Sequence, residues 1–196
     1  MALAVLVILL FLTQRFFLQA QKINKQDLTT SVMNLKDEFF LRQAIALAHQ
    51  ARQAGERPFG AILVLNDEVI AKSQDQCRAL NDPTAHAELR LISSYCNESK
   101  QFDLTGITIY SSAEPCLMCS GAIKWSGISR VVFSVPQAML QKISGGRLKP
   151  TCEELVNTGK RHIDVLGPLL INEGLACYQG FDFALHRQTL LNNHQS

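Results

Sequence analysis

The sequence predicts an α/β fold, a three-layer α/β/α sandwich in which helices cover both faces of a mixed central sheet. Three observations support this prediction: an apolar helical period over residues 40–51, a hairpin pattern over 59–72, and strands that alternate with helices beyond it. A chain of 196 residues that is 47% hydrophobic can bury one sizeable core. We therefore expect a single domain, residues 33–196, behind an apolar leader, residues 1–32.

The first predicted helix runs from residue 37 to a stop at Gly55. Its apolar side chains recur at positions i, i+4, i+7, i+8 and i+11, so they share one face that a sheet can bury. These residues are Phe40, Ala44, Leu47, Ala48 and Ala51.

A β-hairpin is predicted next, because the β-rich run 59–65 and the strand 69–72 flank the turn residues Asn66 and Asp67. A long loop farther along contains glycines and a proline, and long loops of this kind often border a functional site. The expected order after the hairpin is a helix that contains His86, strand 107–111, helix 116–125, strand 130–135, loop 136–160 with one short helix, strand 162–166 and a helix from about 169.

Charge and cysteine content narrow the functional class. A net charge of +2 gives no strong field for nucleic acid, and the C-terminal residues form no Lys/Arg cluster. The six cysteines show no disulfide-framework spacing, which favours a reduced protein. Two of them belong to the motif described next, and the others are expected to be small core residues: Cys77, Cys96, Cys152 and Cys177.

Two short segments, Thr84–Glu88 and Glu114–Cys119, carry the candidate metal ligands. They supply the imidazole of His86 and the thiols of Cys116 and Cys119, which can hold one zinc ion and leave its fourth position open to water. Three protein ligands with an open position are typical of a catalytic zinc, and the sequence lacks the second Cys-x-x-Cys pair of a structural four-cysteine site. We therefore predict one catalytic Zn²⁺ per chain.

Two helix starts would bring these ligands together. Asp82 is predicted as the N-cap and Pro83 as the first residue of one helix, so that the imidazole and Glu88 lie near its N-terminus. Pro115 is predicted to open the second helix, with Glu114 as its cap and both thiols on one face. Because two thiolates cancel the formal charge of zinc, a carboxylate is needed to take the proton of water. Glu88 is the predicted catalytic residue.

Four collinear motifs lie between about residues 35 and 133, namely Pro58–Val64, Asn81–Glu88, Glu114–Cys119 and Gly121–Trp125. They resemble the cytidine/deoxycytidylate deaminase superfamily, in particular its branch of bacterial guanine deaminases and tRNA adenosine deaminases. The resemblance implies the cytidine-deaminase type of sandwich, hydrolytic release of ammonia from a nucleobase or nucleoside, and a homodimer. Beyond Val135 the similarity fades to a general pattern.

Four residues are candidates for contact with the substrate. Phe59 and Trp125 can stack on a planar base, or they can belong to the core. The backbone near Ala87 would help to stabilise the tetrahedral intermediate. Ungapped alignment places Asp75 where guanine and tRNA-adenosine relatives carry an asparagine that binds substrate, unless the loop slips and Asp75 faces solvent. A carboxylate only accepts hydrogen bonds, so Asp75 would suit an edge of the substrate that bears N–H groups.

The remaining histidines are expected in the core or at the surface with no role in the site; they are His49, His162, His186 and His194.

The leading substrate hypothesis is a free purine such as guanine, because the context of Phe59 and Trp125 resembles the guanine branch. Against it, segment 191–196 lacks the C-terminal aromatic residue with which that branch closes its site. The alternative is deamination of wobble adenosine in tRNA, which the weakly charged C-terminal tail disfavours. A remote alternative is a non-enzymatic zinc-binding protein, in which Glu88 would be idle.

The leader, residues 1–32, has three open interpretations. Its apolar run Ala2–Leu12 is shorter than the about 20 residues of a spanning helix unless Arg15 is tolerated. It lacks the charged n-region and the good cleavage site of a signal peptide. The chain can therefore start at Met33, be anchored in a membrane, or carry a cleaved signal. Because the expected substrates are intracellular, the start at Met33 leads and we expect a cytoplasmic enzyme.

Overall fold

The computed structural model describes residues 33–145 and 150–192. Residues 33–53 are helical, and Glu38–Ser196 group into one compact unit that contains the sheet. The leader lies outside the described residues, so its three interpretations stay predictions. Within the described ranges, no helix has the length and apolar character needed to cross a membrane.

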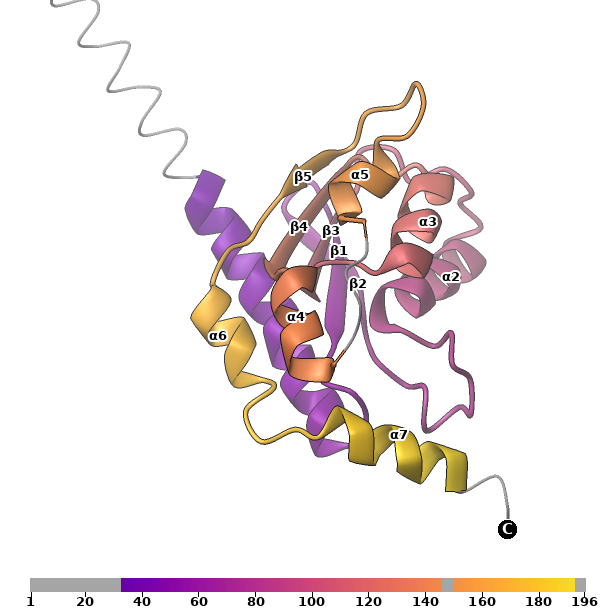
Figure 1. The fold of residues 1–196 in the computed structure, drawn as a ribbon. Helices are drawn as coiled ribbons and strands as arrows, with labels where there is room; N and C mark the ends of the chain where they lie inside the picture. Colours follow the sequence, from indigo (N-terminus) through magenta and orange to yellow (C-terminus); the bar gives the residue numbers. More distant parts are fainter. Residues whose placement is uncertain (1–32, 146–149, 193–196) are drawn as a thin grey trace, which may run out of the picture. The chain divides into compact units, whose positions relative to one another are not determined.

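A five-stranded mixed sheet forms the middle layer of this unit (Figure 1), with the strand order β2-β1-β3-β4-β5. Strand β1 is antiparallel to both of its neighbours, whereas β3, β4 and β5 are parallel to one another. The mixed sheet that the sequence predicts is confirmed. The strands are β1 (Gly60–Leu65), β2 (Glu68–Gln74), β3 (Thr108–Ala113), β4 (Arg130–Val135) and β5 (Asp164–Leu166).

Helices cover both faces of the sheet, as expected for a three-layer sandwich (Figure 1). The helix 38–53, α4 and α6 pack on one face, and α2, α3 and α5 pack on the other. The alternation along β1 explains this, because Ile62 and Val64 join the first cluster while Ala61 and Leu63 join the second. The helices are α2 (Ala87–Ser99), α3 (Leu117–Ser126), α4 (Gln137–Ser144), α5 (Cys152–Val156), α6 (Ile171–Ala176) and α7 (Phe183–Asn192).

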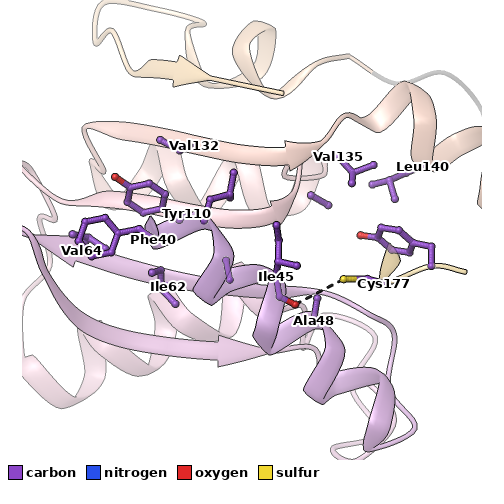
Figure 2. Packing of buried hydrophobic residues seen from close by; sticks show 14 residues of the cluster. Phe40, Ile45, Ala48, Ile62, Val64, Tyr110, Val132, Val135, Leu140 and Cys177 are labelled. Carbon is purple, nitrogen blue, oxygen red and sulfur yellow. Dashed lines mark hydrogen bonds between the residues drawn. The ribbon is translucent and has the colours of Figure 1, made fainter. Parts of the chain in front are cut away.

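The helix 38–53 buries the face that its apolar period predicts. Phe40 points into the core beside Tyr110 of the sheet, with the ring centroids 5.3 Å apart, and Ile45 lies farther along the helix, near Cys177 (Figure 2). Gly60 opens β1 directly under this helix, where an added Cβ would lie 2.5 Å from the Ala44 carbonyl oxygen. A side chain at that position would therefore push the helix off the sheet.

The predicted hairpin turn and the predicted end of the first helix are both confirmed. Asn66 and Asp67 both adopt positive φ, 51° and 65°, which is the geometry of a tight two-residue hairpin turn. Gly55 ends the first helix at φ 80°, as expected of a helix stop.

Two predictions for the C-terminal third are wrong in detail. Segment 136–160 contains two helices, α4 and α5, instead of a long loop with one short helix. The expected terminal helix from about residue 169 is divided into α6 and α7, with Gly180 at φ 69° between them. This division lets α7 turn away from α6, and α7 reaches the site described below.

Candidate active site

Two of the three candidate ligand residues lie at the N-caps of helices. His86 is the N-cap of α2 and Cys116 is the N-cap of α3, so each helix begins one residue later, at Ala87 and Leu117. Neither residue makes a side-chain capping bond. Both side chains are therefore directed to the site instead of back to their own helix.

The predicted helix starts at Pro83 and Pro115 are wrong. The Asp82 side chain instead accepts hydrogen bonds from the Thr84 backbone N–H at 2.8 Å and the Thr84 hydroxyl at 2.6 Å. These bonds close a local turn, which is the common alternative use of an aspartate before a helix. The turn leaves residues 83–86 outside the helix and delivers His86 to its end.

His86, Cys116 and Cys119 form a compact triangle of potential ligand atoms. The Nδ1 atom of His86 lies 3.6 Å and 3.7 Å from the two Sγ atoms, and the sulfurs lie 3.6 Å apart. A tetrahedral zinc with Zn–S of about 2.3 Å and Zn–N of about 2.0 Å requires ligand atoms roughly 3.5–3.8 Å apart. The donor set and its spacing therefore fit zinc.

The two thiols differ in acidity. A hydrogen bond from the Cys119 thiol lowers the pKa of Cys116 to about 3, and His86 contributes in the same direction. The same bond and burial raise the pKa of Cys119. The pair therefore carries a thiolate at neutral pH, the form of cysteine that ligates metal ions.

Glu88 lies beside this cluster on the first turn of α2 and is buried. Its Oε1 accepts a hydrogen bond from the Ser111 hydroxyl at 2.8 Å, and its Oε2 lies 3.5 Å from the Cys119 Sγ. Burial raises the pKa of Glu88, and the negative charge of Cys116 raises it further. A carboxyl group whose pKa is shifted toward neutrality can both take up and release a proton.

A cavity of about 250 Å³ opens in front of the cluster. It lies where β3 and β4 end and β1 begins, because β1 runs antiparallel to β3 and places Phe59 near Ala113 and Glu114. Ligands of α/β proteins commonly bind at such strand ends. His86, Glu88 and Cys116 line the cavity, so the candidate catalytic and metal-binding groups face one space.

Of the predicted substrate-contact residues, one lines the cavity and the others do not. Phe59 lines the cavity, as one of its two interpretations requires. Ala87 is fully buried behind the ligand His86 and does not line it. Trp125 is 86% exposed and does not line it either, so its role as a core residue is wrong, and its role as a stacking residue stays a prediction that the lining does not support. The buried face of α3 contains Cys119 and Ile123, and Trp125 is two residues out of phase with that face.

Asp75 is neither a wall of the cavity nor a solvent-facing residue. Its side chain is completely buried, and Oδ2 forms an ion pair with the Nη2 of Arg57 at 2.8 Å. Burial lowers the pKa of Arg57, but the attraction of Asp75 outweighs this, so the guanidinium stays charged. Arg57, which the sequence analysis did not single out, lines the cavity in place of Asp75.

Helix α7 closes the cavity with residues that the sequence analysis also missed. Phe183, His186 and Arg187 line it, although they lie about one hundred residues from His86 in the sequence. The Phe183 ring lies 6.3 Å from the Phe59 ring, centroid to centroid. An aromatic residue of α7 therefore closes the site. His186 lines the cavity, whereas the sequence analysis expected it to have no role there.

Glu114 links two helices instead of capping α3. Its carboxylate accepts hydrogen bonds from the backbone N–H groups of Gln137 at 2.8 Å and Cys152 at 2.7 Å. These groups belong to the first residues of α4 and α5, where helix backbones leave N–H groups unpaired. Glu114 thus holds the segment after β4 against the end of β3.

The fold and the site define a class of protein: an α/β sandwich with three potential metal ligands and a buried carboxylate beside them. The chain belongs to the cytidine and deoxycytidylate deaminases, whose zinc-binding region matches residues 34–135. It is therefore a deaminase, a hydrolase that acts on carbon–nitrogen bonds.

Three comparisons illustrate this membership. A probable cytosine deaminase of Schizosaccharomyces pombe is 35% identical over 160 residues, which cover 79% of this chain and 97% of that protein. A guanine deaminase of Bacillus subtilis is 39% identical over 101 residues, covering 51% and 65%. A solved structure from studies of A-to-I editing by tRNA:A34 deaminases superposes with a TM-score of 0.62 at 33% identity, covering 71% and 99%.

Proposed function

We propose that this protein hydrolytically deaminates a free nucleobase and releases ammonia, with guanine as the first substrate to test. One zinc per chain would be held by His86, Cys116 and Cys119. The observation that supports this most directly is that His86, Cys116 and Glu88 line one cavity, with the Cys119 Sγ 3.6 Å from the Cys116 Sγ. When bound, zinc acts as a Lewis acid that lowers the pKa of a coordinated water.

Glu88 moves the proton in the proposed reaction. Water adds across the ring C=N bond at the carbon that bears the exocyclic amine: a C–O bond forms, the C=N double bond becomes single, and the ring nitrogen takes one proton of the water. Glu88 takes a proton from the water and delivers a proton to the amine nitrogen; the C–N bond then breaks and ammonia leaves. The Ser111 hydroxyl, which donates to Oε1, leaves Oε2 to face the thiols and orients the carboxylate for this transfer. General acid–base catalysis of this kind contributes roughly 10²–10⁴-fold.

The size of the cavity supports a single base as substrate. Its volume of about 250 Å³ is below the about 300–1,000 Å³ of pockets for drug-sized ligands. Phe59 and Phe183 supply aromatic surface at its wall, on which a planar ring can pack.

Cytosine is the second candidate substrate. The relative from Schizosaccharomyces pombe, named a probable cytosine deaminase, aligns over 97% of its length, which includes the C-terminal region that the family motif leaves out. The guanine deaminase aligns over 65%. Deamination of wobble adenosine in tRNA, the alternative from the sequence, is favoured by the superposition with the structure from tRNA:A34 deaminase studies.

An ammonia-release screen tests the proposal. Purified zinc-loaded protein is incubated with guanine, cytosine, adenine, their nucleosides and a tRNA that carries a wobble adenosine. We expect turnover of a free base that exceeds turnover of the nucleosides and of tRNA. Turnover of tRNA alone supports the alternative, and no release from any substrate contradicts the proposal.

We further propose that residues 33–196 are the catalytic domain and that the protein is a homodimer, as the resemblance implies. Sedimentation of the purified protein at micromolar concentration tests the dimer, and a monomer mass there contradicts it.

A further inference from the structure

Arg57 is held rigidly at the cavity by a buried partner. Its Nη2 donates to Asp75 Oδ2 at 2.8 Å and its Nε lies 3.4 Å from Oδ1, so one edge of the guanidinium faces the carboxylate. Nη2 also donates to the Cys77 Sγ at 2.6 Å. Asp75 is fully buried while the Arg57 side chain is 23% exposed. A planar guanidinium fixed along one edge presents its other edge in a defined direction.

The other edge of Arg57 carries the available donors. Nη1 makes no hydrogen bond with any residue in the described part of the chain, and Arg57 lines the cavity. Asp75 does not present a hydrogen-bonding group to the cavity, because its oxygens already accept hydrogen bonds from Arg57 and from the Cys77 backbone N–H at 3.3 Å. The cavity wall therefore presents N–H donors where the sequence analysis expected a carboxylate acceptor.

The charges around the cavity favour a neutral ligand over an anionic one. The lining contains two arginines, Arg57 and Arg187, and two glutamates, Glu88 and Glu114, and the buried charge of Asp75 balances that of Arg57. Binding of a phosphate group is favoured by an excess of cationic groups. A neutral acceptor, such as a ring carbonyl, suits a guanidinium that is already paired.

We propose that Arg57 is a specificity-determining residue that recognises a carbonyl acceptor on the base, and that Asp75 is the residue that positions it. The assignment rests on the proposed function and narrows its substrate class to bases that carry both an amine and a ring carbonyl. Guanine meets this description through O6 and N7, the acceptor pair that arginine commonly contacts, and cytosine meets it through O2. Adenine has an amine but no carbonyl.

Matched pairs of bases isolate the carbonyl. Guanine and 2-aminopurine differ by the O6 atom, and cytosine and 4-aminopyrimidine differ by O2. We expect the native protein to prefer the carbonyl member of at least one pair by about 10- to 100-fold in kcat/KM, the range for a hydrogen bond to a charged group. The same ratio is measured as Kd by calorimetry in the Glu88→Gln variant, which gives a reading independent of turnover.

The decisive variant is Arg57→Met/Asp75→Asn, which removes the guanidinium together with the buried charge that would otherwise be left unpaired. We expect its carbonyl preference to fall to within about threefold of unity, with zinc content unchanged. Asp75→Asn alone keeps Arg57 but removes its charged partner, so the guanidinium is held less rigidly and the carbonyl preference should decrease. A direct contact of Asp75 with the base would instead predict a gain in guanine activity.

Arg130→Met/Asp164→Asn is the matched control. It removes another Arg–Asp pair with an N···O distance of 2.8 Å, which does not line the cavity. Its carbonyl preference should equal that of the native protein. If the double variant of Arg57 does not fold, the Asp75→Asn ratio alone decides.

Two results with the base pairs overturn the assignment: equal binding of both members of each pair by the native protein, or a carbonyl preference that persists without Arg57. Binding of GMP and dCMP is measured alongside. If the Arg57 variant loses affinity only for these nucleotides, Arg57 belongs to a phosphate site and the assignment is also wrong. Carbonyl-selective binding with no ammonia from any base contradicts the proposed function and leaves the assignment standing. Turnover with an unaltered ratio contradicts the assignment alone.

Discussion

His86 and Cys116 occupy equivalent positions, each at the N-cap of a helix, and the Nδ1 of the first lies 3.6 Å from the Sγ of the second. The N-termini of α2 and α3 therefore meet at one point. Because a helix N-terminus carries a partial positive charge, this arrangement favours thiolates and developing negative charge at that point. Glu88 and Cys119 follow within the first turns of the same helices, so four functional side chains depend on two helix ends.

Loss of both thiols should remove the metal. In Cys116→Ser/Cys119→Ser, hydroxyl groups replace the soft thiolate ligands, so zinc should fall from about one per chain to near zero. Elemental analysis after dialysis measures this. Cys96→Ser is the control: Cys96 is half-buried and is not part of the ligand group, so this variant should keep its zinc. Stoichiometric zinc in the double variant would exclude this site.

Removal of the Glu88 carboxylate should separate chemistry from metal binding. Glu88→Gln keeps the size of the side chain but cannot take a proton, so kcat should decrease by at least about 10²–10⁴-fold. Zinc content and the unfolding midpoint should stay close to native values. Glu98→Gln on the exposed part of α2 controls for helix effects. Loss of zinc from Glu88→Gln would make Glu88 a ligand and contradict the assignment.

Glu114 should contribute to stability through the helix ends that it joins. In Glu114→Gln an amide NH₂ can face the backbone N–H of Gln137 or Cys152, and a charge-assisted acceptor is lost. We expect the free energy of unfolding to decrease by about 2 kcal/mol, measured in urea. Glu153→Gln, an exposed residue of α5, should change it by less than about 0.5 kcal/mol. Equal effects of the two substitutions would contradict this role.

A chain that begins at Met33 should keep its zinc and its turnover. Every described residue that lines the cavity lies between Arg57 and Arg187, and the proposed ligands and Glu88 all lie in that range. Its kcat/KM should agree with that of the full chain within twofold. An insoluble product, or recovery of the intact leader in the membrane fraction, would favour the anchor.

The sequence by itself determines which residues form the candidate ligand group and which architecture the chain adopts. His86 and Glu88 lie in one short segment and Cys116 and Cys119 in another, so local spacing is sufficient to identify them. The hairpin turn and the buried face of the first helix follow from residue types at fixed spacing in the same way. The helix starts do not follow from the sequence, because an aspartate such as Asp82 can cap a helix or close a turn, and here it closes a turn.

Only the tertiary structure decides the rest of the cavity. Arg57 and Asp75 come from two different loops, and their pairing follows from the antiparallel contact of β1 and β2. Phe183 and its neighbours on α7 reach the site because the chain turns after α6, which no local pattern encodes. The physical reason is that a side chain's burial and charge partner depend on what packs against it. An aspartate identical in sequence can face a ligand, solvent or, as here, an arginine.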